Sequence, residues 1–180
     1  VLINNFNFQS IPKYFNNGVV NEKKFLLKNV NTKAKNSENF ENDISNTLLP
    51  TIQSTYTFPL VKETKKFDNT LTPKLSLKLS PDYTRDIRDR SEGRIDYSNI
   101  YDVDRLGIEV ANEGGISATY GYEYTKLDKS IFAQKMKFGF ANNLRLSENK
   151  DLPSHTNLGD KVSDFVGLFE YSSKDNFKLD

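Results

Sequence analysis

The chain has 180 residues, with 25 basic and 24 acidic side chains, no cysteine and a mean hydropathy of −0.64. The balanced charge favours neither nucleic acid nor an acidic partner, and the lack of cysteine excludes disulfides and thiolate sites within the chain. No apolar run approaches the ~20 residues of a membrane helix, although barrel strands need only ~9–11 alternating residues. The chain opens on Val1 and stops inside a strand-like stretch, so we expect it to be a fragment of a larger protein.

Alternating side chains predict strands along most of the chain, because successive residues on a strand point to opposite faces. Residues 1–11 and 20–33 alternate less regularly, and residues 51–60 give the first clear pattern. Residues 71–80 alternate without a fault, with apolar side chains on one face and polar side chains on the other. The apolar face carries Leu71, Pro73, Leu75, Leu77 and Leu79, and the polar face Thr72, Lys74, Ser76, Lys78 and Ser80.

The same pattern returns in the second half of the chain. Residues 94–101, 105–111 and 162–171 are less regular strand candidates. In residues 116–124 the apolar and aromatic face carries Ile116, Ala118, Tyr120, Tyr122 and Tyr124, and the other face Ser117, Thr119, Gly121 and Glu123. In residues 131–140 the face with Phe132, Met136, Phe138 and Phe140 opposes Lys135 and Lys137. No amphipathic helix of useful length is present, so the predicted fold class is all-β with antiparallel strands.

Short turns and long polar connections separate the predicted strands. Residues 16–18 (Asn-Asn-Gly) and 113–115 (Glu-Gly-Gly) tolerate positive φ and are expected in hairpins, and residues 128–129 indicate a tight turn. Long polar connections are expected at residues 35–46, 81–93 and 144–161. Such alternation is typical of an outer-membrane barrel, and a soluble β-sandwich or solenoid shows it too. The pattern by itself leaves these architectures open.

The positions of the charged residues predict which face of each strand would contact lipid and which would face the lumen of a barrel. A lysine at the lipid-facing midplane costs ~2–4 kcal/mol, so exposing the face of Lys135 and Lys137 to lipid would cost up to ~8 kcal/mol. We therefore expect a lumen-facing set of Lys74, Lys78, Ser117, Thr119, Glu123, Lys135 and Lys137. The expected lipid-facing set is Leu75, Leu77, Tyr120, Tyr122, Phe132 and Phe138. The aromatic side chains fit either a girdle at a membrane interface or a core stripe, and in a sandwich the second set would face the core.

No group of side chains indicates an enzyme, a cofactor or a metal site. His155 is the only histidine, so we expect a solvated loop residue and neither a zinc site nor a Ser-His-Asp triad. Residues 85–90 mix arginine with aspartate, which indicates a solvated or self-paired loop better than an anion site. Asp102, Asp104 and Arg105 lack the spacing of a metal loop, and we expect them in a charge network inside the lumen that ties strands together.

Four segments carry a further signal in their order and spacing. They are Leu-Thr-Pro-Lys-Leu-Ser-Leu-Lys-Leu-Ser-Pro at 71–81, Tyr-Ser-Asn-Ile-Tyr-Asp-Val-Asp-Arg-Leu-Gly at 97–107, Glu-Gly-Gly-Ile-Ser-Ala-Thr-Tyr-Gly-Tyr-Glu-Tyr at 113–124, and Asp-Leu-Pro at 151–153 with Leu-Gly-Asp-Lys-Val-Ser-Asp-Phe-Val-Gly at 158–167. Together they resemble the C-terminal barrel of the lipopolysaccharide-assembly outer-membrane protein family, also called organic solvent tolerance proteins. The last segment is similar to the alphaproteobacterial version of that family.

The resemblance implies a transmembrane barrel of about 26 strands, of which residues 1–180 would supply about eight to ten within one barrel domain. It implies a translocon in the outer membrane of a Gram-negative bacterium that inserts lipopolysaccharide into the outer leaflet. The implied partners are lipopolysaccharide, a lipoprotein plug inside the barrel and proteins of a periplasmic transport bridge, without a cofactor, covalent chemistry or nucleic acid. The alternatives are another outer-membrane barrel, such as a receptor or porin, or a soluble secreted β-sandwich or solenoid that acts as a binding module.

Overall fold

A computed structural model describes residues 1–33, 35, 44–129, 135–172 and 178–179. Its strands form one ten-stranded sheet, and every pairing is antiparallel. In chain order they are β1 (Leu2–Gln9), β2 (Lys13–Tyr14), β3 (Val20–Lys33), β4 (Ile44–Thr57), β5 (Leu60–Glu63), β6 (Phe67–Ser80), β7 (Gly115–Asp128), β8 (Lys135–Arg145), β9 (Val166–Ser172) and β10 (Lys178–Leu179). Within the described ranges the helical structure is limited to one 3₁₀ turn, η1 (Asn157–Gly159). None of the described helical structure has the length and hydropathy needed to cross a membrane.

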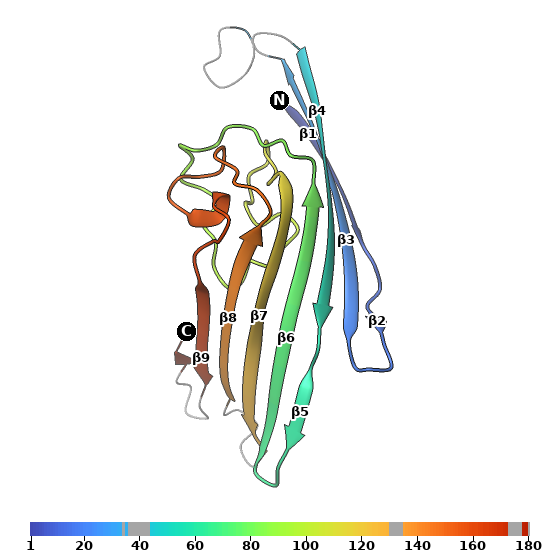
Figure 1. Ribbon diagram of the computed structural model, residues 1–180, viewed down its shortest axis with the longest axis vertical. Coiled ribbons are helices and arrows are strands. Elements are labelled where there is room, and N and C mark those ends of the chain that lie inside the picture. The colour runs from blue at the N-terminus through green and yellow to red at the C-terminus, as the bar shows by residue number, and fades with distance from the viewer. Residues whose placement is uncertain (34, 36–43, 130–134, 173–177, 180) are drawn as a thin grey trace.

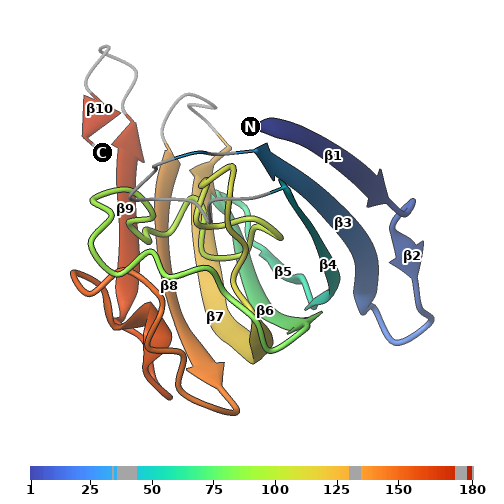
Figure 2. The ribbon, with the colours of Figure 1, turned by 90° about the horizontal axis from the view of Figure 1, so that it is seen from above.

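The sheet is a long meander that curves around one side (Figures 1 and 2). Its strand order is β1-β3-β4-β6-β7-β8-β9-β10, with β2 paired to β3 and β5 paired to β6. The curvature gives the sheet a concave and a convex face, and these two names are kept below. An all-β antiparallel sheet of this shape is consistent with part of a barrel wall.

β4 and β5 follow one line along β6, interrupted at residues 58–59. Thr57 pairs with Lys74 and Leu60 pairs with Leu71, so the register is the same on both sides of the gap. In the gap the Phe58 amide donates to the carbonyl of Pro73 at 3.0 Å, but Pro73 has no N–H to return the bond, so the hydrogen-bonded ladder is interrupted there while the chain direction continues. The predicted strand at residues 51–60 is therefore confirmed, with a proline interruption near its end.

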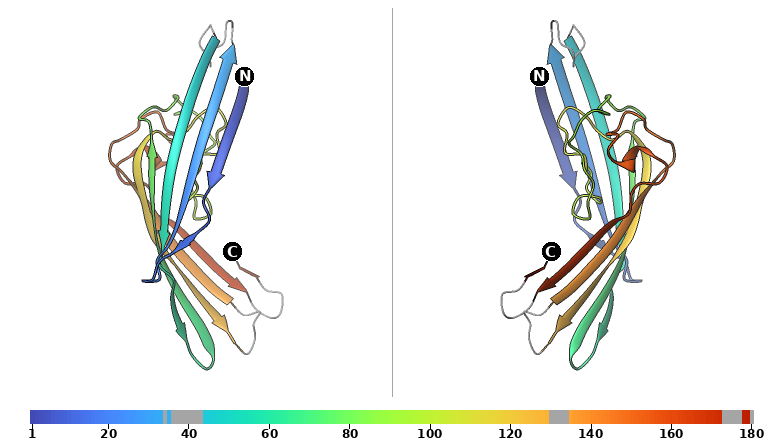
Figure 3. Two further views of the ribbon diagram at one scale, coloured as in Figure 1. Left: turned by 90° about the vertical axis from the view of Figure 1, so that its right-hand side faces the viewer. Right: turned by 90° about the vertical axis from the view of Figure 1, so that its left-hand side faces the viewer.

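The two ends of the sheet differ in how the strands are joined. At one end lie the short turns at residues 15–19 and 64–66, together with the last residues of β7 and β9; we call this the short-turn end. At the opposite end lie the connections from β6 to β7, residues 81–114, and from β8 to β9, residues 146–165. Figure 3 shows these two long connections away from the β5–β6 turn.

Residues 81–114 fold back over the concave face, and we call them the inward connection (Figure 2). A small core joins them to the second long connection. Its buried side chains come from Ile87, Leu106, Ile108 and Ala111 of the inward connection and from Leu152 and Leu158. The hydrophobic core thus lies inside the curve of the sheet, between two connections rather than between two sheets.

Several sequence expectations hold and others are wrong. The strands expected at 1–11, 20–33, 71–80 and 116–124 are present, and the Asn-Asn-Gly turn is confirmed by a φ of 82° at Gly18. The strands expected at 94–101 and 105–111 are wrong, because both segments are turns within the inward connection. The hairpin expected at 113–115 is also wrong, since these residues end that connection and start β7. The turn expected at 128–129 begins where β7 ends, and residues 130–134 lie outside the described residues.

Candidate functional site on the concave face

The inward connection closes on itself where it leaves and re-enters the sheet. The amides of Gly115 and Tyr83 both donate to the carbonyl of Pro81, at 3.1 and 2.7 Å. Gly115 has a φ of 91°, and a Cβ on Gly114 would lie 2.5 Å from the carbonyl oxygen of Tyr83. The pair of glycines is therefore needed both for left-handed backbone and for the close approach of two chain segments.

A buried carboxylate, Glu113, binds three cations from different parts of the fold. Its oxygens lie 2.5 Å from the Lys78 ammonium of β6, 2.6 Å from the guanidinium of Arg105 and 2.5 Å from that of Arg145 of β8. Arg105 binds in the two-pronged manner, since its Nε and Nη2 each donate to one carboxylate oxygen. The cluster, which we call the Glu113 network, therefore anchors the end of the inward connection to two strands.

Arg105 carries the Glu113 network further across the sheet. Its guanidinium donates to the hydroxyl of Thr119 at 3.0 Å, to that of Ser117 at 3.1 Å and to Asn143 Oδ1 at 3.0 Å. Ser117 and Thr119 belong to β7 and Asn143 to β8, and all are buried. Every strand hydroxyl that Arg105 contacts points to the concave face, so the arginine holds the inward connection against that face.

The electrostatics of the Glu113 network favour an ionised carboxylate. Burial by itself would raise the pKa of the Glu113 carboxyl, but Arg105 and Lys78 oppose burial and bring that pKa well below its usual range. One negative charge faces three positive ones, so the network keeps a positive balance inside the fold. Such a balance needs Glu113 charged, because its protonation would leave three buried cations without a counterion.

A second buried lysine ties β3 to the inward connection. Lys28 is 1% exposed and forms an ion pair with Asp104 at 2.7 Å. Its ammonium also donates to the carbonyls of Ile108 and Ala111, at 2.8 and 2.9 Å. These three acceptors satisfy the three donors of the ammonium, which explains how a lysine can be buried here.

Two tyrosines of the inward connection lie on glycines of the concave face. A Cβ on Gly139 of β8 would lie 2.3 Å from the Tyr97 ring, and one on Gly121 of β7 would lie 2.5 Å from the Tyr101 hydroxyl. The Tyr97 hydroxyl donates to the carbonyl of Tyr122 at 3.3 Å. The glycines therefore provide the space into which the two rings fit.

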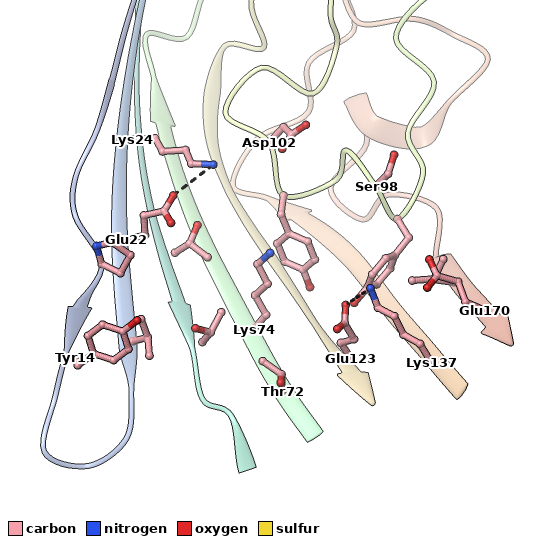
Figure 4. A pocket seen from close by; sticks show the side chains of 17 residues that line it. Tyr14, Glu22, Lys24, Thr72, Lys74, Ser98, Asp102, Glu123, Lys137 and Glu170 are labelled. Atoms are coloured by element: carbon pink, nitrogen blue, oxygen red, sulfur yellow. Dashed lines mark ion pairs between the residues drawn. The ribbon is translucent and has the colours of Figure 1, made fainter. Parts of the chain in front are cut away.

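A cavity of about 600 Å³ lies between these tyrosines and the short-turn end, on the concave side (Figure 4). Charged side chains of five strands line it: Glu22, Lys24, Lys74, Glu123, Lys137 and Glu170. Lys137 pairs with Glu123 at 3.0 Å and Lys24 with Glu22 at 3.4 Å, as Figure 4 shows. The Lys74 ammonium instead lies 4.0 Å from the centre of the Tyr101 ring, a cation–π contact.

The Tyr97 hydroxyl at this cavity stays neutral at ordinary pH. Burial, and to a smaller extent the charge of Glu123, raise the pKa of Tyr97 to about 12. The described residues contain no group of three or more side chains arranged to hold a metal ion. The cavity thus offers paired charges, hydroxyl groups and aromatic faces, which suit the passage or binding of a polar molecule.

A family model described as LptD, LPS transport system D, matches residues 15–180. The chain belongs to the LptD family. No curated protein and no solved structure matches it. LptD is a transport and assembly family, and its role is the transport of lipopolysaccharide in outer-membrane assembly. The strands from β3 to β10 and both long connections lie inside the matched range, and β1 and β2 precede it.

In this LptD chain the predicted lumen-facing residues fall into two groups on the concave face. Lys78, Ser117 and Thr119 are buried under the inward connection, in contact with Glu113 or Arg105. The other group lies nearer the short-turn end. Lys74, Glu123 and Lys137 line the cavity. Lys135 is exposed and lies two residues before Lys137 on the same strand. Whether this face lines a lumen stays a prediction.

The predicted lipid-facing residues lie on the opposite, convex face. Leu75, Leu77, Tyr120 and Tyr122 are exposed there, at 41, 46, 39 and 41%. Phe138 packs against Tyr124 at a ring separation of 5.0 Å. Phe132 lies outside the described residues. The contact of this face with lipid likewise stays a prediction.

Sequence reasoning missed the centre of the LptD site. The Glu-Gly-Gly pattern predicts a turn at Glu113, and no local pattern marks Lys28 or Arg145, because their partners lie far away in the chain. The signal that could have found Lys28 and Arg145 is a charged side chain on a strand, which is costly to bury unless it is paired. Within the charge network expected at residues 102–105, two side chains bind strand residues: Asp104 pairs with Lys28, and Arg105 donates to Thr119.

The two loop interpretations agree with the geometry. Arg88 pairs with Asp86 at 2.5 Å inside the mixed-charge segment, and both side chains are about half exposed. This hydrogen-bonded arginine lowers the pKa of Asp86 to about 2. His155 is exposed in the second long connection.

Proposed function

We propose that this chain forms part of the wall of a barrel in the outer membrane of a Gram-negative bacterium, through which lipopolysaccharide reaches the outer leaflet. The concave face lines a water-filled lumen and the convex face lies in lipid. The chemistry is transport without a covalent step, so the protein is not an enzyme. The family match does not favour the receptor, porin or soluble-module alternatives.

The observation that carries the proposal is the separation of polar and apolar side chains over the two faces of one sheet. On β6, Leu71, Leu75, Leu77 and Leu79 are 38 to 51% exposed on the convex side. Ser76 and Lys78, between them, are buried on the concave side. A soluble sheet would cover the apolar face and expose the polar one, whereas a barrel in lipid reverses this arrangement.

The connections orient the barrel. Outer-membrane barrels have short turns on the periplasmic side and long loops outside. The short-turn end is therefore periplasmic, and the inward connection enters the lumen from the outer side. In this proposed orientation the cavity of Figure 4 lies on the periplasmic side of the inward connection, where lipopolysaccharide delivered by the periplasmic transport bridge would arrive.

The edges of the sheet support the view that residues 1–180 belong to one larger barrel domain. In the described part of the chain, β1 pairs only with β3 and β10 only with β9, so each leaves one edge open. An open edge in lipid would leave backbone polar groups without partners, and closure of the barrel removes that cost. Further strands cover these edges, and a lipoprotein plug occupies the lumen that they enclose.

Transport-dependent crosslinking tests the proposed function. A photoreactive phenylalanine derivative replaces Lys74 in the cavity or, as the control, Leu75 on the convex face, in cells that depend on the protein. We expect lipopolysaccharide adducts at position 74 that vanish when the supply of lipopolysaccharide is interrupted. Adducts at position 75 should not follow the supply. No supply-dependent adduct at position 74 would contradict the proposal.

A further inference from the structure

The convex face carries a band of basic residues at the short-turn end. Cross-strand pairing brings Lys62 of β5 next to Asn69 of β6, and Asn69 next to Lys126 of β7. Residues paired in this way have Cβ atoms about 4.5–5.5 Å apart, so the two lysine side chains leave the sheet on either side of Asn69. We call Lys62, Asn69 and Lys126 the basic row.

An apolar row lies directly beside the basic row, toward the middle of the strands. It consists of Leu60, Leu71 and Tyr124, which pair across the same three strands. The apolar row, together with Lys62 and Asn69 of the basic row, lines a groove of about 410 Å³, and the Tyr124 hydroxyl donates to Asn69 Oδ1 at 2.8 Å. The surface therefore changes from apolar to basic within one step along the strands.

The lysines of this surface lack carboxylate partners. Lys62, Lys66 and Lys126 form no ion pair with any described residue, and the last two only approach the Phe67 ring, at 5.1 and 4.1 Å. The nearby acids Glu63 and Asp68 both pair instead with Lys129, at 3.8 and 2.7 Å. Since Glu63 and Asp68 alternate with the basic row, they point to the concave side. The convex side at this end is left with positive charge.

The depth of the basic row fits a membrane boundary. Along β7 the convex positions from Ile116 to Tyr124 are apolar or aromatic, and Lys126 follows. At ~3.3 Å per residue and a tilt of about 40°, the distance from Ile116 to Lys126 corresponds to about 25 Å across the membrane. The apolar band of such barrels has about this height. Lys126 thus falls at the level of the lipid headgroups.

We infer that the basic row binds the phosphate-bearing headgroup of an anionic phospholipid in the periplasmic leaflet. The headgroup lies between Lys62 and Lys126, with the Asn69 amide beneath it, and an acyl chain lies along Leu60 and Leu71. This inference rests on the proposed membrane orientation, and it adds a site on the outside of the barrel, separate from the concave face. Lysines near a membrane surface attract anionic lipid at short range, and here geometry adds a defined position.

Lipid retention tests the inference on the intact protein. After delipidation in detergent, the protein is inserted into nanodiscs made of equal parts phosphatidylglycerol and phosphatidylcholine, extracted again, and analysed by mass spectrometry for the lipids that remain bound. We expect the wild-type protein to retain phosphatidylglycerol preferentially. The double variant Lys62→Gln and Lys126→Gln should lose roughly tenfold or more of this preference. Arginine at both positions should preserve it.

A matched control removes the same charge at the same end. Lys13→Gln with Lys65→Gln alters two exposed lysines outside the basic row and should retain the preference. Equal retention by the glutamine double variant and the wild type would overturn the inference, as would an equal loss in the control. Failure of the wild-type protein to enter nanodiscs of phosphatidylcholine alone would instead contradict the proposed function. The two failures are therefore distinguishable.

Discussion

Glu113 is the residue whose charge the concave face depends on most. Lys78, Arg105 and Arg145 reach it from two strands and from the inward connection, all within 2.6 Å and with side chains at most 5% exposed. The Coulomb attraction of such a cluster offsets a large desolvation cost only while the carboxylate is present. Removing one partner of a buried ion pair is more damaging than replacing the whole pair with apolar groups.

Glu113→Gln should therefore destabilise the folded barrel by roughly 3–5 kcal/mol, because three buried cations lose their counterion. Urea titration of the intact protein in detergent measures the change. Glu148→Gln, at an exposed position of the second long connection, is the control and should leave the unfolding midpoint unchanged. Equal midpoints for the wild type and Glu113→Gln would show that the Glu113 network contributes no stability.

The lowered pKa of Glu113 predicts how the stability difference between the wild type and Glu113→Gln depends on pH. A carboxyl whose pKa is lower in the folded state stabilises the fold above its unfolded pKa, near the ordinary 4.5. That contribution fades as the pH falls below this value toward the folded pKa. The stability gap between the wild type and Glu113→Gln should be full at neutral pH and shrink on acidification below pH 4.5. A gap that widens on acidification would contradict the assignment.

Gly139→Ala tests how the Tyr97 ring is seated. The added Cβ would lie 2.3 Å from that ring, so the tyrosine must move away, at a cost of about 1–3 kcal/mol. We expect faster proteolysis within residues 81–114 than in the wild type. Gly167→Ala on β9, where the nearest atom would be 3.8 Å away, should leave the cleavage rate unchanged. Equal rates for both variants would show that the ring does not depend on this space.

At the scale of elements, most strands were predictable, as was a long connection at residues 81–93, but its continuation to residue 114 and its path over the concave face were not. The strict alternation at 71–80 and 116–124 reflects two environments on the two faces of a sheet, and such a pattern is local. Ile95, Tyr97 and Tyr101 also suggest alternation, but they pack on glycines and on the small cluster around Ala141. The positions of these three side chains are determined by contacts with strands far away in the chain, not by a local strand pattern. The Glu113 network likewise joins residues 32 and 35 positions apart, which no local spacing reveals.

The inward connection should restrict the lumen, because it lies inside the curve of the sheet and is anchored at both ends. Replacing residues 85–111 with a short Gly-Ser linker should increase single-channel conductance in planar bilayers several-fold. Asp86→Asn with Arg88→Gln removes only an exposed ion pair of the same connection and serves as the control. Unchanged conductance after the replacement would mean that the connection does not obstruct the lumen.

At the scale of the whole molecule, one curved sheet separates two environments. The concave face combines buried ion pairs, a charged cavity and the inward connection, and the convex face exposes leucine and tyrosine. The proposed function accounts for the combination, since a barrel that transports lipopolysaccharide would have a polar interior for its cargo and an apolar exterior for the membrane. Sequence alternation alone did not distinguish this arrangement from a sandwich, because lipid and protein core select the same apolar face.

The most direct test of this account compares neighbouring residues on the two faces. Single cysteines replace Thr57 and Thr72, which line the cavity, and Tyr56 and Leu71, which are exposed on the convex face, in the intact protein reconstituted in liposomes. A water-soluble thiol reagent should label positions 57 and 72, and a lipid-soluble quencher should reach only probes at 56 and 71. The reverse pattern, or aqueous labelling at all four positions, would contradict the assignment of the concave face to a lumen and the convex face to lipid.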